Sequence, residues 1–336
     1  MRPRRVSSLI GLAMVVATTA AAEAVTYGDL EFPKDEHQHL QGLDYWWGAA
    51  DVFTTAGNHY TVGVGWASFN GYVISGHQVI PHQGAYDGSM ILSADGPAEW
   101  GHPEVFGDFV RAASVYVPGV SDLLTVDAFE TRSGLRNVSR WERTTLDREE
   151  YRFRLDQPRA KIHPSGERIP LSVDLTADMQ GPPLLAGGAG TWWYELPQTY
   201  GYPSRSFQYM QAAEKVTGTL RIAGGPTETV DSTRSRMVMT HEYDATPEDI
   251  PAGLGVAMST QLHPTFFTTY QGGMPWELFF LDLGNGAQLM VAVLAFHDTP
   301  DGTAAPIVGP DQSTYRVLAT IRLPSGESVP LDDVLH

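Results

Sequence analysis

Apolar and polar residues alternate along most of this chain, as they do in β-strands that bury one face. Residues 171–175 alternate three aliphatic side chains with two polar ones. Residues 60–66 place two aromatic residues and two valines on one face, and residues 317–323 repeat the alternation near the end. Convincing helical periods are nearly absent. The pattern therefore predicts an all-β protein.

Turn-forming residues divide this pattern into short strands. Asn285 stands between two glycines and separates two apolar runs, and residues 324–326 (PSG) form a second such break. Asn and Gly tolerate the positive φ that tight hairpins need. With 34 glycines and 23 prolines in the chain, we expect antiparallel strands joined by hairpins.

Two tandem tryptophan pairs, Trp46-Trp47 and Trp192-Trp193, each begin a long strand-rich segment. Between these segments, residues 181–190 (GPPLLAGGAG) are turn-forming and carry no strand pattern. A boundary there would give two halves of similar length and strand content, and an ancient duplication of a barrel is one hypothesis for them. The predicted domains are residues 25–185 and 186–336.

The first 24 residues have the composition of a secretory signal peptide. Arg2, Arg4 and Arg5 form a basic start, and a short apolar run and an Ala-Glu-Ala site at residues 22–24 follow. We expect cleavage near Ala24 and a secreted or periplasmic mature protein. No later segment is apolar enough to predict a transmembrane helix.

Composition narrows the classes of partner. The formal net charge is −17, and removal of the signal peptide would make the chain more acidic still. Such acidity argues against nucleic acid or an anionic membrane surface as a partner. There is no cysteine, so an exported protein of this kind relies on its core rather than on disulfides. The oligomeric state is left open.

Residues 236–245 carry the sharpest local signal for chemistry. If they form a strand, Met239, His241 and Tyr243 share one face and Glu242 lies on the other. An imidazole and a phenol on an apolar face are candidate catalytic groups. The alternative is a core histidine that is hydrogen-bonded to a backbone carbonyl.

Glu277 is the second candidate catalytic residue. On a strand it shares its face with Phe279 and Leu281. An apolar environment would raise the pKa of this carboxyl and let it donate a proton. The alternative is an edge-strand glutamate that reaches water.

Aromatic side chains could line an apolar site or stabilise a developing cation. Many tryptophans of a β-protein simply belong to its core, and that alternative applies to part of this set. The predicted substrate-binding residues are Trp46, Trp47, Trp192, Trp193, Tyr194, Tyr209, Met239 and Trp276.

Metal and cofactor sites are not expected. His37 and His39 would share a strand face and could begin a metal site, but no third ligand follows at a diagnostic spacing. Nucleotide-binding loops and nucleophile elbows are also missing from the sequence. We therefore predict no metal and no cofactor.

Four segments together resemble the lipocalin-like family that includes carotenoid 1,2-hydratase, kievitone hydratase and the AttH-like secreted proteins. Residues 39–66 fit a histidine followed by a tryptophan girdle and a Gly-rich strand. Residues 205–222 (RSFQYMQAAEKVTGTLRI) resemble an aromatic strand that continues into V-x-G-T-L. The acidic-aromatic motif of the family is matched by MTHEYDA at 239–245, and its last motif by WELFFLDLGNGAQLM at 276–290.

The resemblance implies two lipocalin-like antiparallel β-barrels packed together, with one tryptophan pair at the start of each. It also implies catalytic roles for His241, for Tyr243 in place of a tryptophan, and for Glu277 in place of an aspartate. These replacements leave open whether the reaction is a hydration, a cyclisation or none.

The predicted function is that of an exported, cofactor-independent enzyme acting on a hydrophobic isoprenoid or polyketide-like substrate. Hydration of an alkene, as by a hydro-lyase, is the leading mechanism, and acid-catalysed isomerisation or cyclisation is related to it. The main alternative is a non-catalytic carrier of lipids or pigments. A glycan-active enzyme is a third possibility, which the apolar strand faces do not favour.

Overall fold

We describe a computed structural model of the 336-residue chain. The predicted signal peptide, residues 1–24, lies outside the described residues. The structure describes residues 25–27, 30–39, 43–69, 72–82, 90–92, 109–113, 117–120, 122–130, 137–146, 149–163, 165–179, 181–188, 191–194, 204–245, 276–283, 285–295 and 315–331.

Eight antiparallel strands form a closed hydrogen-bonded circuit, because β10 pairs with both β6 and β11. The circuit has no free edge, which is the defining property of a barrel. In order around the circuit, the strands are β3 (Leu43–Phe53), β4 (His59–Phe69), β5 (Tyr72–Pro81), β6 (Met90–Leu92), β10 (Glu150–His163), β11 (Arg168–Met179), β14 (Ser204–Ile222) and β16 (Arg236–Ala245).

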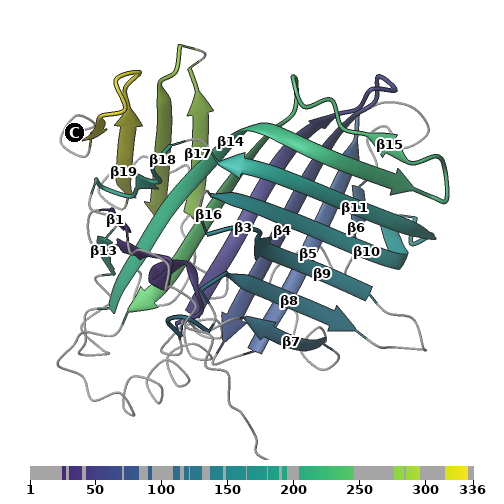
Figure 1. Cartoon of the computed structure of the whole chain (residues 1–336), viewed down its shortest axis with the longest axis horizontal. Helices are drawn as coiled ribbons and strands as arrows, with labels where there is room; N and C mark the ends of the chain where they lie inside the picture. Colours follow the sequence, from purple (N-terminus) through teal and green to yellow (C-terminus); the bar gives the residue numbers. More distant parts are fainter. Residues whose placement is uncertain are drawn as a thin grey trace, which may run out of the picture.

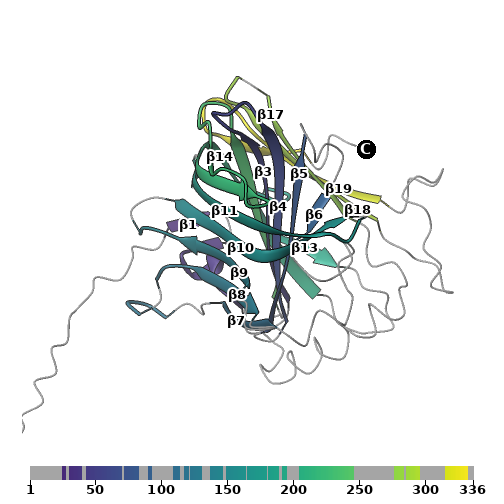
Figure 2. The same cartoon turned by 90° about the vertical axis from the view of Figure 1, so that its right-hand side faces the viewer.

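Two walls of the barrel face each other across the core. Figure 1 shows β8–β11 crossing over β3–β5, and the turned view of Figure 2 separates the two groups of strands. Three strands extend the wall beyond β10, in the order β9 (Asn137–Arg143), β8 (Thr125–Glu130) and β7 (Phe109–Ala113). β5 runs beside β7 and β8. The wall therefore continues past the short strand β6.

Short elements cover the barrel and extend β14. β1 (Val25–Tyr27) pairs with β2 (Leu30–Phe32), and the 3-10 helix η1 (Lys34–Glu36) follows. None of the helices in the described part of the chain is long and apolar enough to cross a bilayer. The strands β12 (Leu184–Leu185), β13 (Thr191–Tyr194) and β15 (Glu228–Thr229) all pair with β14.

The alternation predicted from the sequence determines which side chains form the core. Along β11 every second residue from Ile169 to Met179 is buried, so this face points into the barrel. The largest buried side chains of the core are aromatic: Trp46, Trp66, Trp141, Tyr151 and Phe153. Full burial of one such side chain stabilises a fold by roughly 1.5–3 kcal/mol, so the packed aromatic rows are a main source of stability.

Gly218 is required where β14 passes close to β11. Its φ is +135°, and a Cβ there would lie 2.0 Å from the carbonyl oxygen of Asp174. No other residue fits this approach without moving backbone. The carbonyl oxygen of Gly218 accepts a hydrogen bond from the backbone N–H of Val230 at 3.0 Å. This bond helps to hold the segment after β15 on β14.

A separate four-stranded antiparallel sheet forms the C-terminal part of the described chain, and Figure 1 shows it beside β14. The turn prediction at Asn285 is confirmed, because the Asn285 side chain accepts from the N–H of Ala287 at 3.0 Å. The turn over residues 324–326 is also confirmed, with the N–H of Leu323 donating to Glu327. The strands are β17 (Trp276–Asp282), β18 (Gln288–Ala295), β19 (Tyr315–Arg322) and β20 (Ser328–Pro330).

The all-β antiparallel prediction is confirmed, but the strands after residue 185 are distributed differently from the expectation. β14 pairs with β11, and β16 pairs with β3, so both complete the barrel that residues 43–179 begin. A division at residue 185 therefore cuts through one continuous sheet. Strands β17–β20 of the predicted second barrel form the separate four-stranded sheet. This sheet is joined to the barrel by the Thr320 hydroxyl, which donates to the Leu185 carbonyl at 2.6 Å.

Candidate functional site

Strand register places one row of polar and aromatic side chains at one end of the barrel. Tyr243 on β16 lies opposite Asp44 on β3, and His241 lies opposite Trp46. Directly opposed residues share a face of the sheet, and alternation puts Met239 on that face and Glu242 on the other. The predicted alternation of residues 237–243 is therefore confirmed, although the barrel that they line contains β3 rather than being a separate second one.

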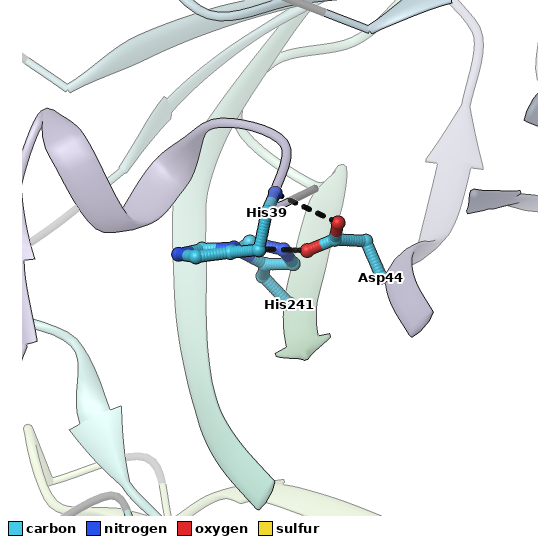
Figure 3. Close-up of side chains that lie close together, drawn as sticks. All are labelled: His39, Asp44 and His241. Carbon is cyan, nitrogen blue, oxygen red and sulfur yellow. Dashed lines mark hydrogen bonds and ion pairs between the residues drawn. The ribbon is translucent and has the colours of Figure 1, made fainter. Parts of the chain in front are cut away.

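The carboxylate of Asp44 is the centre of this row. It is fully buried, and its Oδ2 accepts a hydrogen bond from the backbone N–H of His39 at 2.9 Å. Its Oδ1 lies 3.0 Å from Nδ1 of His39 and 3.2 Å from Nε2 of His241. Figure 3 shows the two imidazoles reaching this one carboxylate. Two histidines from segments about 200 residues apart thus share a single acceptor group.

The hydrogen-bond partners of His39 and His241 determine which ring nitrogens carry a hydrogen. An ionised carboxylate only accepts hydrogen bonds, so each ring nitrogen that faces Asp44 carries a hydrogen. In a neutral His241 this hydrogen is on Nε2, and Nδ1 keeps its lone pair. Nδ1 is buried and has no hydrogen-bond partner among the residues that the structure describes. It is available to accept a proton.

The two histidines have opposite pKa shifts. Burial disfavours the charged form of His39, but the hydrogen bonds and charges of Asp35 and Asp44 outweigh it and raise its pKa to about 9. Burial lowers the pKa of His241, against the pull of Asp44 and with the help of the His39 charge. At neutral pH the site therefore pairs an imidazolium with a neutral imidazole on one carboxylate.

Asp35 fixes the other nitrogen of His39. Its Oδ1 lies 3.4 Å from Nε2 of His39, and its Oδ2 accepts from the backbone N–H of Glu31 at 2.6 Å. Burial works against the Asp35 carboxylate, but the His39 hydrogen bond and the Glu31 N–H together lower its pKa. Both nitrogens of His39 thus lie against carboxylates.

Aromatic rings wall the site. His39 stacks on Tyr243 with ring centroids 3.6 Å apart, and Tyr243 stacks on Phe207. His241 stacks on Trp46 at 4.7 Å and meets the edge of Tyr209 at 5.6 Å. Aromatic faces attract cations when water is excluded, so these walls suit a positively charged ring or a cationic intermediate.

A second buried charge pair seats the segment that carries His39. Glu36 is fully buried, and Arg143 Nη1 donates to its Oε2 at 2.6 Å. The hydroxyl of Tyr151 donates to the other carboxylate oxygen of Glu36, and the Trp46 indole donates to its backbone carbonyl at 3.1 Å. Burial and the Glu36 charge raise the pKa of Tyr151 well above its usual range. The triad of Glu36, Arg143 and Tyr151 thus holds η1 over the barrel end.

The predicted site residues divide into two groups. His241, Tyr243, Trp46, Tyr209 and Met239 lie on the inward faces of β3, β14 and β16. The remaining residues lie elsewhere, or their side chains lie outside the described part of the chain, so their roles stay predictions: Trp47 is half-buried on the opposite face of β3, Trp192, Trp193 and Tyr194 lie on β13, and Trp276 and Glu277 lie on β17.

Sequence reasoning missed Asp44 and misplaced His39. The prediction that His37 and His39 share a strand is wrong, because His37 ends η1 and His39 follows in an irregular segment. Two signals could have found Asp44. It stands two residues before Trp46 on the same strand face, and an acidic residue on an otherwise buried face needs a partner.

Comparisons with known proteins place the fold. No protein-family model matches the chain, and neither does any curated protein sequence. An AttH candidate from Nitrosomonas europaea is similar in structure with a TM-score of 0.50 and 14% identity, covering 90% of this chain and 72% of that one. Kievitone hydratase from Nectria haematococca gives a TM-score of 0.44 and 13% identity, over 93% and 69%. The resemblance found in the sequence motifs is thus supported at the level of the fold, and the chain is similar in fold to the lipocalin-like AttH proteins.

Proposed function

We propose that the protein is a hydratase-like enzyme that acts on a hydrophobic substrate at the barrel end lined by Trp46, Tyr209 and His241. One observation carries the proposal. His241 has a buried Nδ1 with no hydrogen-bond partner within the described part of the chain, while its Nε2–H is held by the buried carboxylate of Asp44. A neutral imidazole oriented by a carboxylate is the arrangement of a general base.

The chemistry of alkene hydration assigns work to these residues. A proton adds to one alkene carbon and leaves a cation on the other, which the faces of Trp46, Tyr209 and Tyr243 stabilise. Water then bonds to the cation and gives its surplus proton to Nδ1 of His241. Asp44 stabilises the imidazolium that forms. The proton donor predicted from the sequence is Glu277 or a neighbouring acid.

The charges around the site favour a neutral substrate and a cationic intermediate. Arg143 is matched by Glu36, and the charge of His39 offsets only one of the two carboxylates Asp35 and Asp44. The remaining negative charge would repel the head group of a fatty acid and attract a carbocation. An isoprenoid or polyketide-like chain without a carboxylate fits this balance.

Incubation in ¹⁸O-labelled water tests the proposal. A panel of prenylated and isoprenoid alkenes is incubated with the protein, and mass spectrometry follows the gain of one labelled water. His241→Gln removes the base and is expected to slow turnover at least about a hundredfold. His59→Gln is the matched control, because His59 also pairs with an aspartate, at 2.5 Å, but on the solvent side.

The alternative function is a carrier of lipids or pigments, which needs the apolar walls but no base. Mass spectrometry of molecules extracted from the natively purified protein distinguishes the two. A carrier would hold its ligand unchanged, and His241→Gln would leave both ligand and label uptake as they are. That result, together with no label gained by any alkene, would refute the enzyme proposal.

Export of the mature protein is part of the proposal and rests on the composition of residues 1–24. N-terminal sequencing of material recovered outside the cytoplasm is expected to begin at Val25. A retained Met1 in that fraction would contradict export through a cleaved signal peptide.

A further inference from the structure

We propose that His39, Asp44 and His241 form a binding site for one divalent transition-metal cation, with Zn²⁺ as the natural probe. The three side chains offer two imidazole nitrogens and one carboxylate oxygen, and these atoms lie within 4.8 Å of one another. Imidazole and carboxylate are ligands that zinc uses in proteins. The inference concerns binding and does not depend on the proposed hydration.

Two of the three separations between the ligand atoms suit a tetrahedral ion. Oδ1 of Asp44 lies 3.0 Å from Nδ1 of His39 and 3.2 Å from Nε2 of His241. Bonds of about 2.0–2.1 Å to zinc would separate two tetrahedral ligands by about 3.3 Å. The two imidazole nitrogens lie within 4.8 Å of each other, so they would need to approach by at most about 1.5 Å. On binding, His39 loses its Nδ1 hydrogen as a proton, and the Nε2 hydrogen of His241 moves to Nδ1.

The groups behind the ligands are those that support a metal site. A histidine that binds a metal commonly donates its other ring N–H to a carboxylate. Nε2 of His39 has such a partner in Asp35, which is itself fixed by the N–H of Glu31. The second oxygen of Asp44 accepts the backbone N–H of His39. Two of the three ligands are therefore already oriented.

Charge balance also favours a cation. With both imidazoles neutral, Asp35 and Asp44 leave two negative charges in a buried cluster. Arg143 is engaged with Glu36, and Lys34 with Glu31. A divalent ion would neutralise the two carboxylates, whereas the single charge of a protonated His39 neutralises one. Burial strengthens this attraction, because little water screens it.

Metal binding and the proposed hydration would require different tautomers of His241. Zn²⁺ takes the lone pair of His241 Nε2, which moves the ring hydrogen to Nδ1 and removes the base. If the enzyme proposal holds, Zn²⁺ is therefore expected to inhibit turnover, and a chelator such as EDTA is expected to restore it. Three protein ligands leave a fourth position for water or substrate.

The test is calorimetric titration of chelator-treated protein with Zn²⁺, repeated with Co²⁺ to record the visible bands of a tetrahedral site. We expect one ion per chain. Asp44→Asn and His241→Gln should abolish binding, and Asp35→Asn should weaken it about 10–100-fold, as loss of an outer carboxylate does. Asp35→Asn keeps all three ligands, so it remains informative if a ligand variant does not fold.

The controls use the exposed aspartate–histidine pair of the same barrel. Asp51→Asn and His59→Gln remove surface groups that could also attract zinc, and neither should change the affinity of the buried site. The inference is overturned if no ion binds, if His241→Gln binds as the unaltered protein does, or if only the His59 variant loses the ion. None of these results bears on label uptake from water, so the two proposals can fail separately.

Discussion

Each end of the barrel holds a carboxylate, which is fully buried at Asp44 and half-buried at Glu228, and the two carboxylates have different partners. At one end Asp44 faces two imidazoles. At the other, the hydroxyls of Thr54 and Tyr60 and the amide of Asn58 all donate to Glu228, at 2.7, 2.9 and 3.0 Å. Asp44 near the start of β3 and Thr54 just after its end are ten positions apart, or about 33 Å of extended chain.

The difference in partners indicates that one end of the barrel has a structural role and that the other can take part in chemistry. The partners of Glu228 do not change their charge near neutral pH, and their hydrogen bonds join the β3–β4 turn to β15. The partners of Asp44 are imidazoles, which can take up or release a proton, and one of their nitrogens is unpartnered among the described residues. The hydrogen bonds of Glu228 keep its end of the barrel closed, whereas the Asp44 end has groups that can react.

The largest expected effect is that of Asp44→Asn. Removing one partner of a buried charge pair typically costs about 3–5 kcal/mol, and here the charge of His39 loses one of its two carboxylate neighbours. Urea denaturation measures the change in the free energy of unfolding. Asp51→Asn is the matched control on the same strand, and its exposed pair with His59 should contribute less than about 1 kcal/mol. Equal losses in the two variants would contradict the special role of the Asp44 end.

The stability of the Asp44 end should depend on pH. The folded state raises the pKa of His39 from 6.5 to about 9, so its stabilisation is complete below pH 6.5 and is lost as the pH rises to about 9. The slope from one proton is at most about 1.4 kcal/mol per pH unit. The lowered pKa of His241 works in the opposite direction, because the unfolded state takes up that proton first as the pH falls.

Denaturation at a series of pH values measures this profile. His39→Gln should remove the decline above pH 6.5, whereas Glu228→Gln, at the other end of the barrel, should keep it. A decline that persists in the His39 variant would assign it to another group.

The smallest expected effect is that of Glu228→Gln. A glutamine oxygen can still accept from Thr54 or Tyr60, but its NH₂ group cannot, so one or two hydrogen bonds are lost at about 1 kcal/mol each. Thermal unfolding should show this loss. Zinc affinity and label uptake should be unchanged, because Glu228 has no part in the Asp44 cluster. A change in either would show that the two ends are coupled.

Local features of the fold could be predicted from the sequence, and long-range pairings could not. Alternation in β11 and β16 and the turn at Asn285 depend on neighbouring residues, so the pattern found them. The place of β14 and β16 between β11 and β3 depends on pairings across large sequence separations, which alternation does not encode. A boundary drawn at residue 185 followed composition and missed those pairings.

The same limit applied to the site. His241, Tyr243 and Trp46 were predicted because each stands in an unusual local pattern. The role of Asp44 follows from the register between β3 and β16 and from the irregular segment that brings His39 back over the barrel end. Neither can be read from neighbouring residues. The sequence offered Glu277 as the acid because its neighbours are apolar, and this role stays a prediction.

The insertion of β14 and β16 between β11 and β3 also decides how the chain can be divided. A fragment of residues 25–185 would present the edges of both β3 and β11 without partners, and unpaired edges readily recruit strands from other chains. A fragment of residues 186–336 carries the two strands that fill this gap. The pair is thus suited to a split reporter, in which two separately produced pieces regain the barrel, and with it the contact between Asp44 and His241, only when they meet.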